Sequence, residues 1–237
     1  MSRPPKSRTL VIFDVDGTLF DANVCDSDCF DRAFQEVVGM ALAESEWSTF
    51  TEVTAQAIIH QALGANYSGD IVSVETRIRD SFLTRLQTVN GRGPASIRAF
   101  EGALNLFSAL RSHADFHVAI ATGCWRETAH FKLTAAGFDL ENIPFASASD
   151  CYSRADIIRL AAERAGMNLQ QAVYVGDGPW DLRATRQLGI PFIGVGHKRE
   201  ALRNAGARHT LDHLCANALS ELIRQIREEG RGASGRI

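Results

Sequence analysis

Two pairs of aspartates in this 237-residue chain have a spacing that suits metal and phosphate chemistry. Asp14 and Asp16 come directly after one short apolar run, and Asp177 and Asp181 come after another. Carboxylates this close repel one another unless a cation or a shared proton compensates. Their hard oxygens suit Mg²⁺, which binds a few carboxylates together with waters and a phosphate. We therefore expect the four aspartates to form a Mg²⁺ site, although each pair alone also fits a turn and Asp181 a helix N-cap.

A third polar feature, Thr122-Gly123, follows the apolar run of residues 116–121. The Thr122 hydroxyl can donate a hydrogen bond to an oxyanion, and Gly123 allows the backbone to approach a ligand closely. The same dipeptide is also common as a helix cap. Trp125 and Arg126 come next in the chain, and we expect all four residues to contact the substrate. A helix-start aromatic and a surface arginine explain the last two equally well.

The apolar runs that precede these residues are short and uninterrupted, as in strands buried on both faces of a parallel sheet. Five are predicted as strands: residues 9–13, 116–121, 144–148, 172–175 and 191–195. Helical spacing is found at residues 125–136, 154–165, 181–188 and 211–227. This alternation predicts an α/β fold with helices on both faces of the sheet. The carboxyl ends of the strands, which carry the polar residues, would then line the ligand crevice.

Residues 22–96 break this rhythm because they contain no obvious buried strand. Helix-like stretches cover residues 25–38, 47–63 and 70–89, with glycines between them. This segment has ten acids and five arginines, so its net charge is −5, against −3 for the whole chain. We predict a core domain of residues 1–21 and 97–237, interrupted by a helical cap domain of residues 22–96. The crossings near Asp21 and residues 93–99 would act as hinges.

Taken together and in this order, the motifs resemble those of the haloacid dehalogenase superfamily, in its phosphatase branch with a helical cap, such as the phosphoglycolate phosphatase-like proteins. The matching positions are Asp14, Asp16, Gly17 and Thr18 for the first motif, Thr122 for the second, and Gly176, Asp177 and Asp181 for the fourth. The resemblance spans residues 9–211 and implies a Rossmann-like parallel sheet core with an inserted all-helical cap. It also implies a phosphoric monoester hydrolase.

The resemblance implies a mechanism as well. Asp14 would attack phosphorus and form an aspartyl-phosphate, and Asp16 would protonate the leaving oxygen and later deprotonate water. Asp14, Asp177 and the backbone carbonyl of Asp16 would bind Mg²⁺, and Asp181 would support the metal directly or through water. Thr122 would bind a phosphoryl oxygen.

The third motif of the family is a lysine at a helix start, and here Arg154 takes that place. Arginine stays cationic and can pair with Asp14 and phosphate, but its planar fork is wider than an ammonium. Arg154 also fits a surface cation near neighbouring acids. The chain has only three lysines, and Lys132, on the predicted helix after Thr122, is the other candidate for the missing charge.

These residues predict a Mg²⁺-dependent phosphatase that acts on a small phosphorylated metabolite. A phosphomutase of the same superfamily and a non-catalytic phosphorylatable or metal-binding regulatory module are the alternatives. The predicted cap has no lysine, which argues against a phosphonatase that forms a Schiff base there. Asp16 favours phosphoryl transfer over halide displacement. Sugar phosphates, phosphoglycolate and nucleoside monophosphates all stay open as substrates.

The composition agrees with an ordinary globular enzyme. Hydrophobic residues make up 45% of the chain and charged residues 22%, and the net charge of −3 argues against binding to nucleic acid. No apolar run approaches the roughly 20 residues that span a bilayer, so we expect no membrane association. Five scattered cysteines and no apparent secretion signal predict a cytoplasmic protein with reduced thiols. The sequence leaves the oligomeric state open.

Overall fold

A computed structural model of the chain describes residues 8–21, 23–42, 50–65, 67–90 and 97–234. The centre of the fold is a parallel sheet with the strand order β5-β4-β1-β6-β7-β8. Its strands are β1 (Thr9–Phe13), β4 (Phe116–Ala121), β5 (Phe145–Ala146), β6 (Ala172–Gly176), β7 (Phe192–Gly194) and β8 (His209–Thr210). The predicted parallel α/β fold is therefore confirmed, and each of the five predicted strands is present.

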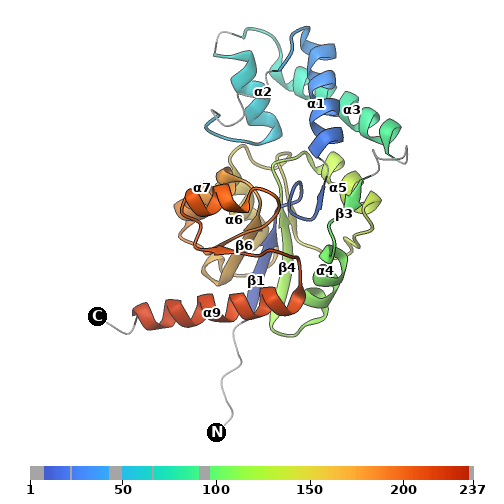
Figure 1. The fold of residues 1–237 in the computed structure, drawn as a ribbon. Helices are drawn as coiled ribbons and strands as arrows, with labels where there is room; N and C mark the ends of the chain where they lie inside the picture. Colours follow the sequence, from blue (N-terminus) through green and yellow to red (C-terminus); the bar gives the residue numbers. More distant parts are fainter. Residues whose placement is uncertain (1–7, 22, 43–49, 66, 91–96, 235–237) are drawn as a thin grey trace.

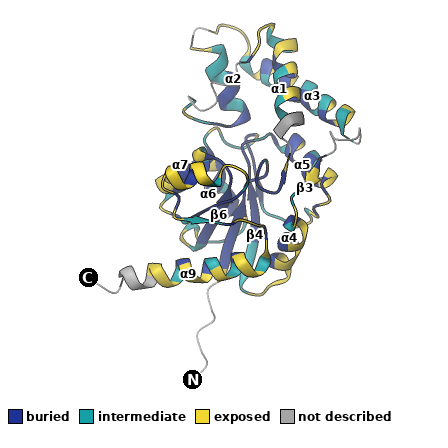
Figure 2. Ribbon diagram, viewed as in Figure 1, coloured by how far each residue is buried: buried dark blue, intermediate teal, exposed yellow. Residues whose placement is uncertain are grey.

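Successive side chains of each strand point to opposite faces of the sheet. Because the inner strands carry apolar side chains on both faces, helices cover both. In β1, Val11 and Phe13 pack on the face covered by α4 (Ala103–Ser112), α5 (Arg126–Ala135) and α9 (Ala216–Ser234). Leu10 and Ile12 pack on the other face, under α6 (Arg154–Arg164), α7 (Pro179–Leu188) and α8 (Arg199–Asn204). The buried strands lie between the two helical layers (Figure 2).

Within the segment inserted after β1, the described residues form three helices over the carboxyl end of the sheet (Figure 1). They are α1 (Asn23–Val38), α2 (Ala55–Leu63) and α3 (Ile71–Val89), and we refer to them and their connections as the helical insert. α3 packs on α1 and also contacts α5. Trp125 joins the apolar core of the insert, with ring centroids 5.9 Å from Phe30 and 6.4 Å from Phe82.

A short antiparallel pair links the insert to the rest of the chain. β2 (Phe20–Asp21) pairs with β3 (Arg98–Ala99), so the chain leaves and re-enters the α/β layers side by side. The predicted crossings lie here, except for residues 93–96, which are outside the described residues. The exact division into a core and a cap domain at residues 22 and 96 stays a prediction.

Two predicted helices begin later than expected. α2 starts at Ala55 because Thr54 caps it, its hydroxyl accepting a hydrogen bond from the Ala57 amide. Residues 47–49 of the predicted helix lie outside the described residues. α9 starts at Ala216 because Leu211 continues the strand ladder, its amide donating to the Gly194 carbonyl at 2.9 Å. Helices α4 and α8 and strands β2, β3 and β8 were not predicted. None of the helices described here has the length and apolar character needed to cross a membrane.

Candidate active site

The nucleophile predicted from the sequence, Asp14, lies where the central strand of the sheet ends. The parallel register pairs Phe13 of β1 with Val175 of β6, so the residues that follow the two strands meet at one edge. Asp14 and Asp177 are both buried there, and Asp181 joins them from the first turn of α7. Carboxylate oxygens of the three aspartates lie within 4.8 Å of one another. We call these three residues the acidic triad.

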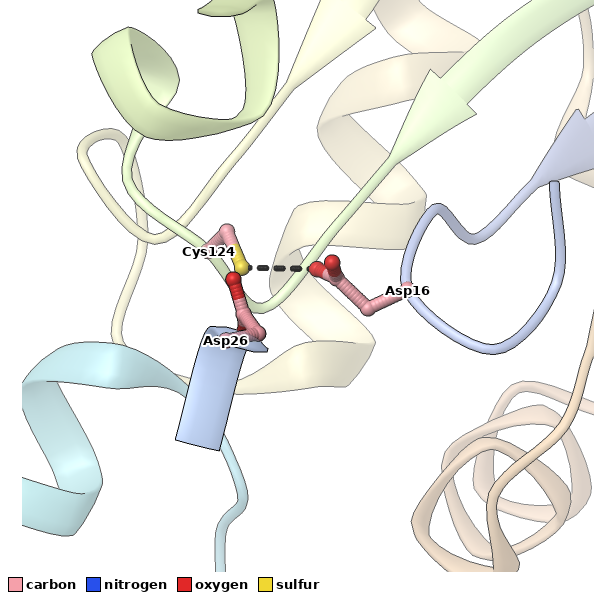
Figure 3. A group of neighbouring side chains, drawn as sticks. All are labelled: Asp16, Asp26 and Cys124. Atoms are coloured by element: carbon pink, nitrogen blue, oxygen red, sulfur yellow. Dashed lines mark hydrogen bonds between the residues drawn. The ribbon is translucent and has the colours of Figure 1, made fainter. Parts of the chain in front are cut away.

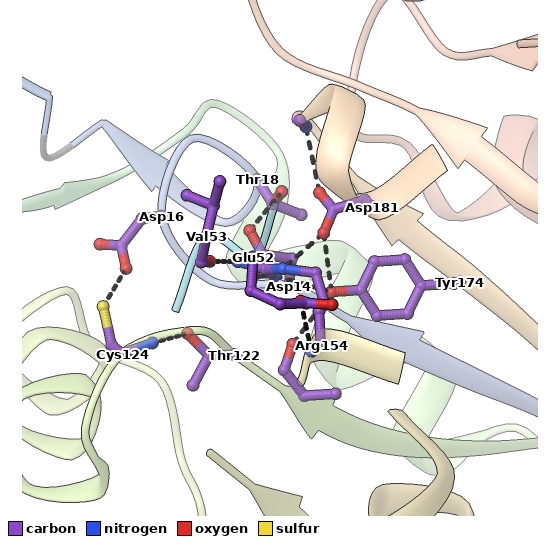
Figure 4. A network of polar contacts seen from close by, with 12 residues as sticks. Asp14, Asp16, Thr18, Glu52, Val53, Thr122, Cys124, Arg154, Tyr174 and Asp181 are labelled. Atoms are coloured by element: carbon purple, nitrogen blue, oxygen red, sulfur yellow. Dashed lines mark hydrogen bonds and ion pairs between the residues drawn. The ribbon is translucent and has the colours of Figure 1, made fainter. Parts of the chain in front are cut away.

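Arg154 lies against two members of this triad, Asp14 and Asp181, as Figure 4 shows. It is the first residue of α6, and its Nη1 lies 3.0 Å from Asp14 Oδ1 and 2.9 Å from Asp181 Oδ1. Its Nη2 donates to the Val53 carbonyl of the helical insert at 2.9 Å. The side chain is only 7% exposed. The structure thus places Arg154 at the nucleophile, where the family resemblance implied a lysine, and its fork also contacts the insert.

The electrostatics of the triad favour a bound divalent cation. Burial raises the pKa of Asp14 well above its ordinary value, and the charge of Asp181 raises it further. Burial, followed by the charge of Asp181, also raises the pKa of Asp177 to about 7. When ionised, the three carboxylates and the one guanidinium leave a formal charge of −2. A hard divalent cation with oxygen ligands fits that charge and that donor set, so these residues fit Mg²⁺.

Asp16 lies apart from the triad, in a second group of polar side chains that also includes Asp26 and Cys124 (Figure 3). Cys124 Sγ donates to Asp16 Oδ2 at 2.8 Å. The ammonium of Lys132 contacts all three, at 2.6 Å from Asp16, 2.8 Å from Asp26 and 3.2 Å from Cys124. Burial raises the pKa of Asp26 to about 6, although Lys132 opposes that shift. A cation therefore already lies among these ligand atoms.

Two positions in the site require glycine, because neighbouring atoms lie where a side chain would begin. Gly17 has φ +75°, and a Cβ there would lie 2.3 Å from Oδ2 of Asp177. A Cβ on Gly123 would lie 2.4 Å from Nη2 of Arg154 and 2.8 Å from the Val53 carbonyl oxygen. Any larger residue at these positions would displace the groups that surround Asp14.

A cavity of about 100 Å³ lies between the acidic triad and the helical insert. Asp14 and Asp16 both line it, so the two predicted catalytic carboxylates share one space. Thr122, Gly123 and Trp125 line it as well, in agreement with their predicted place at the substrate. The Thr122 hydroxyl accepts a hydrogen bond from the Cys124 amide at 3.1 Å, and its own proton is therefore free to point elsewhere.

Arg126 has a different environment from the one predicted. Its Nη2 lies 2.8 Å from both carboxylate oxygens of Asp150, and its guanidinium lies over the Phe145 ring at 5.4 Å. It is absent from the described residues that line the cavity. The prediction that Arg126 contacts substrate therefore has no geometric support here.

Several residues of the site were missed by sequence reasoning. Tyr174, within β6, donates from its buried hydroxyl to the Ala121 carbonyl at 3.0 Å and lies 3.3 Å from Asp181. A tyrosine inside an otherwise apolar strand was the available signal, because a buried hydroxyl needs a partner. Val53 and Asp26 carried no such signal, since each reaches the site only through the packing of the insert.

Comparison with known proteins gives a family and a fold. The sequence profile described as haloacid dehalogenase-like hydrolase matches residues 11–195. A phosphoglycolate phosphatase of Mesorhizobium japonicum is 24% identical over 231 residues, which cover 94% of this chain and 99% of that protein.

Solved structures with a similar fold include three bacterial proteins. A hydrolase from Pseudomonas syringae superimposes with a TM-score of 0.72 at 21% identity, covering 91% of this chain and 98% of its own. CbbY from Rhodobacter sphaeroides, solved with phosphate, has a TM-score of 0.70 at 21% identity, with coverages of 87% and 95%. A β-phosphoglucomutase from Clostridium difficile has a TM-score of 0.71 at 14% identity, with coverages of 92% and 98%. At these identities the likeness establishes the fold alone.

Proposed function

The chain belongs to the haloacid dehalogenase-like hydrolases, and from that premise we propose that it is a Mg²⁺-dependent phosphatase acting on a small phosphate monoester. The observation that carries the proposal is the environment of Asp14. This carboxylate is buried at the end of the central strand, faces a small cavity, and lies beside a cation and two further acids. Such a group suits a nucleophile that must be desolvated and positioned before substrate binds.

In the first step, an oxygen of Asp14 attacks phosphorus and the bond to the ester oxygen breaks. The product is an aspartyl-phosphate on Asp14, and the leaving oxygen takes a proton from Asp16. Both carboxylates line the same cavity, which supports this division of roles. Arg154 contacts Asp14 Oδ1 and so fixes one carboxylate oxygen, leaving the other to attack.

In the second step, water attacks phosphorus and the bond to Asp14 breaks. Asp16 takes the proton of that water, so the enzyme returns to its starting state and inorganic phosphate is released. The hydroxyl of Thr122 would donate to a phosphoryl oxygen in both steps. Mg²⁺, when bound by Asp14, Asp177 and the Asp16 carbonyl with Asp181 in support, would neutralise charge on the phosphoryl oxygens.

The substrate is inferred to be a small phosphorylated metabolite. The cavity of about 100 Å³ is well below the roughly 300–1,000 Å³ typical of small-molecule sites. The Mesorhizobium relative, named for phosphoglycolate, supports a substrate of that size. We expect the reaction to take place in the cytoplasm, where the five thiols of the sequence would stay reduced.

Phosphate release tests this proposal. Wild type should release phosphate from p-nitrophenyl phosphate and small monoesters with Mg²⁺, and should lose that activity with a chelator. Asp14→Asn should lower kcat by more than about 10³-fold, because the amide is a poor nucleophile. Release that survives Asp14→Asn would refute the nucleophile. An isomerised substrate in place of free phosphate would assign the chain to the phosphomutases. This outcome is worth testing because one protein of similar fold is named β-phosphoglucomutase.

A further inference from the structure

The cavity has an acidic floor and an apolar roof. The floor carries Asp14, Asp16 and Asp177, whereas the helical insert contributes apolar side chains from all three of its helices. These are Phe30 on α1, Ile58 on α2 and Phe82 on α3, together with Val53 before α2. All four are buried. The insert also contributes Asp26, whose carboxylate is held by Lys132, and Thr54, whose hydroxyl donates to the Tyr152 carbonyl. The side that faces away from the nucleophile, where a leaving group would lie, is therefore mostly hydrocarbon.

Two buried cations at this space already have acidic partners. Arg154 is the one cationic residue among the described residues that line the cavity, and it contacts Asp14, Asp181 and the Val53 carbonyl. The ammonium of Lys132 is fully buried between Asp16 and Asp26. Neither is available to a second negative charge on a substrate.

Four of the five described basic residues of the helical insert pair with acids outside the cavity, and the fifth, Arg77, is not among the residues that line it. Arg85 pairs with Glu36, Arg79 with Asp80 and Glu127, Arg32 with Asp28, and His60 with Glu75. None of these pairs lies among the described residues around the cavity. Lys198 does not line the cavity but lies near its edge. It is exposed, stands 5.4 Å over the ring of Trp180, which is a lining residue, and its charge opposes the rise in the pKa of Asp177. Among its described residues, the insert therefore places no cationic side chain in the lining of the cavity.

We propose, building on the phosphatase function above, that the insert forms a leaving-group subsite for a small, uncharged, apolar alcohol. The substrate class is then the phosphate monoester of a short alkyl or similar alcohol. A carboxylate or second phosphate would lose its water against Phe30, Ile58 and Phe82 without gaining a cation. It would also lie near the carboxylates of Asp16 and Asp26 and be repelled by them. Phosphoglycolate and sugar bisphosphates are therefore disfavoured.

A matched pair of esters tests the subsite. Isobutyl phosphate and phosphoglycolate have leaving groups of nearly the same shape, with two methyl groups in place of the two carboxylate oxygens. With Mg²⁺, kcat/KM should be at least about tenfold higher for isobutyl phosphate, since burying an unpaired carboxylate is costly. Equal values or a preference for phosphoglycolate would overturn the subsite and leave the phosphatase function intact.

A third ester separates the two proposals. Release from p-nitrophenyl phosphate with none from either small ester would overturn the subsite alone. Release from none of the three would overturn the phosphatase function, and the subsite with it.

A charge placed in the roof provides an independent test. Ile58→Lys should move the ratio of kcat/KM values at least tenfold toward phosphoglycolate, because it supplies the absent cation. Val72→Lys is the matched control, since Val72 lies on the same insert with its side chain exposed to solvent. It adds the same charge away from the cavity and should leave the ratio unchanged. An unchanged ratio in a folded Ile58→Lys enzyme would overturn the subsite; if that variant does not fold, the wild-type ratio still decides.

Discussion

The inference that Arg154 balances the charge of the buried aspartates can be tested by measuring the stability of the protein, without an activity assay. Replacing it with methionine keeps a long side chain but leaves Asp14 and Asp181 buried without their cation. Removing one partner of a buried ion pair costs about 3–5 kcal/mol. Replacing it with lysine keeps the charge but cannot reproduce both branches of the fork. The hydrogen bond to the Val53 carbonyl would be lost, at a cost of about 1.5–3 kcal/mol.

Urea unfolding followed by circular dichroism measures these differences. With a slope of about 2 kcal/mol per molar urea, the midpoint should fall by about 2 M for Arg154→Met and about 1 M for Arg154→Lys. Arg159→Met is the control, because Arg159 lies on the same helix and pairs with Asp156 at the surface, where a pair is worth about 0–1 kcal/mol. Mg²⁺ should restore more stability to Arg154→Met than to wild type, since it supplies charge that the variant lacks. If Arg154→Met unfolded at the same urea concentration as Arg159→Met, the inference that the guanidinium balances the buried acids would be wrong.

Three further outcomes follow from the two groups of carboxylates. Lys132→Met should destabilise the protein by about 3–5 kcal/mol, measured in urea against the surface control Arg159→Met, because Asp16 and Asp26 lose their shared cation; equal midpoints would contradict this. Asp16→Asn should lower kcat by about 10²–10⁴-fold without unfolding the chain, and a loss below tenfold would remove Asp16 as the acid. The pKa of Asp177 is raised from 3.8 to about 7, so its folded form holds a proton that the unfolded chain has released; the metal-free protein should lose stability through that pH range. Calorimetric Mg²⁺ affinity should therefore rise with pH up to about 7, and Asp177→Asn should weaken that rise; the same pH dependence in Asp177→Asn as in wild type would contradict the proton competition.

The central sheet was predictable because its inner strands are apolar at nearly every position, with Thr9 in β1 and His117 in β4 as exceptions. β1, β4 and β6 are bounded by polar residues, and both of their faces are covered by helices. The two-residue strands were harder to predict. β8 consists of His209 and Thr210, half-buried residues with no apolar run, and its place in the sheet depends on pairing with β7. Such an element is defined by its neighbour and carries little local signal.

The carboxylates were predictable as individual residues, but their grouping was not. Residues at the ends of adjacent parallel strands must meet, which placed Asp14 near Asp177. The sequence suggested one cluster of four aspartates, whereas the structure shows Asp16 turned toward Lys132 and Asp26. Lys132 is 106 residues from Asp26 and 116 from Asp16, and its contact with Asp26 depends on how the insert docks on α5. No local pattern encodes that docking.

The two predicted catalytic carboxylates are each joined to the helical insert through one cation. Asp14 contacts Arg154, which donates to the Val53 carbonyl, and Asp16 contacts Lys132, which contacts Asp26 on α1. Both cations are almost fully buried, so their interactions are poorly screened by water. A movement of the insert away from the sheet would therefore remove one acceptor from each cation and admit water to both carboxylates at once. With the insert docked on the sheet, the same insert that would contact the leaving group also supplies an acceptor to each of the two cations. The charges around the nucleophile and the acid therefore depend on the position of the insert.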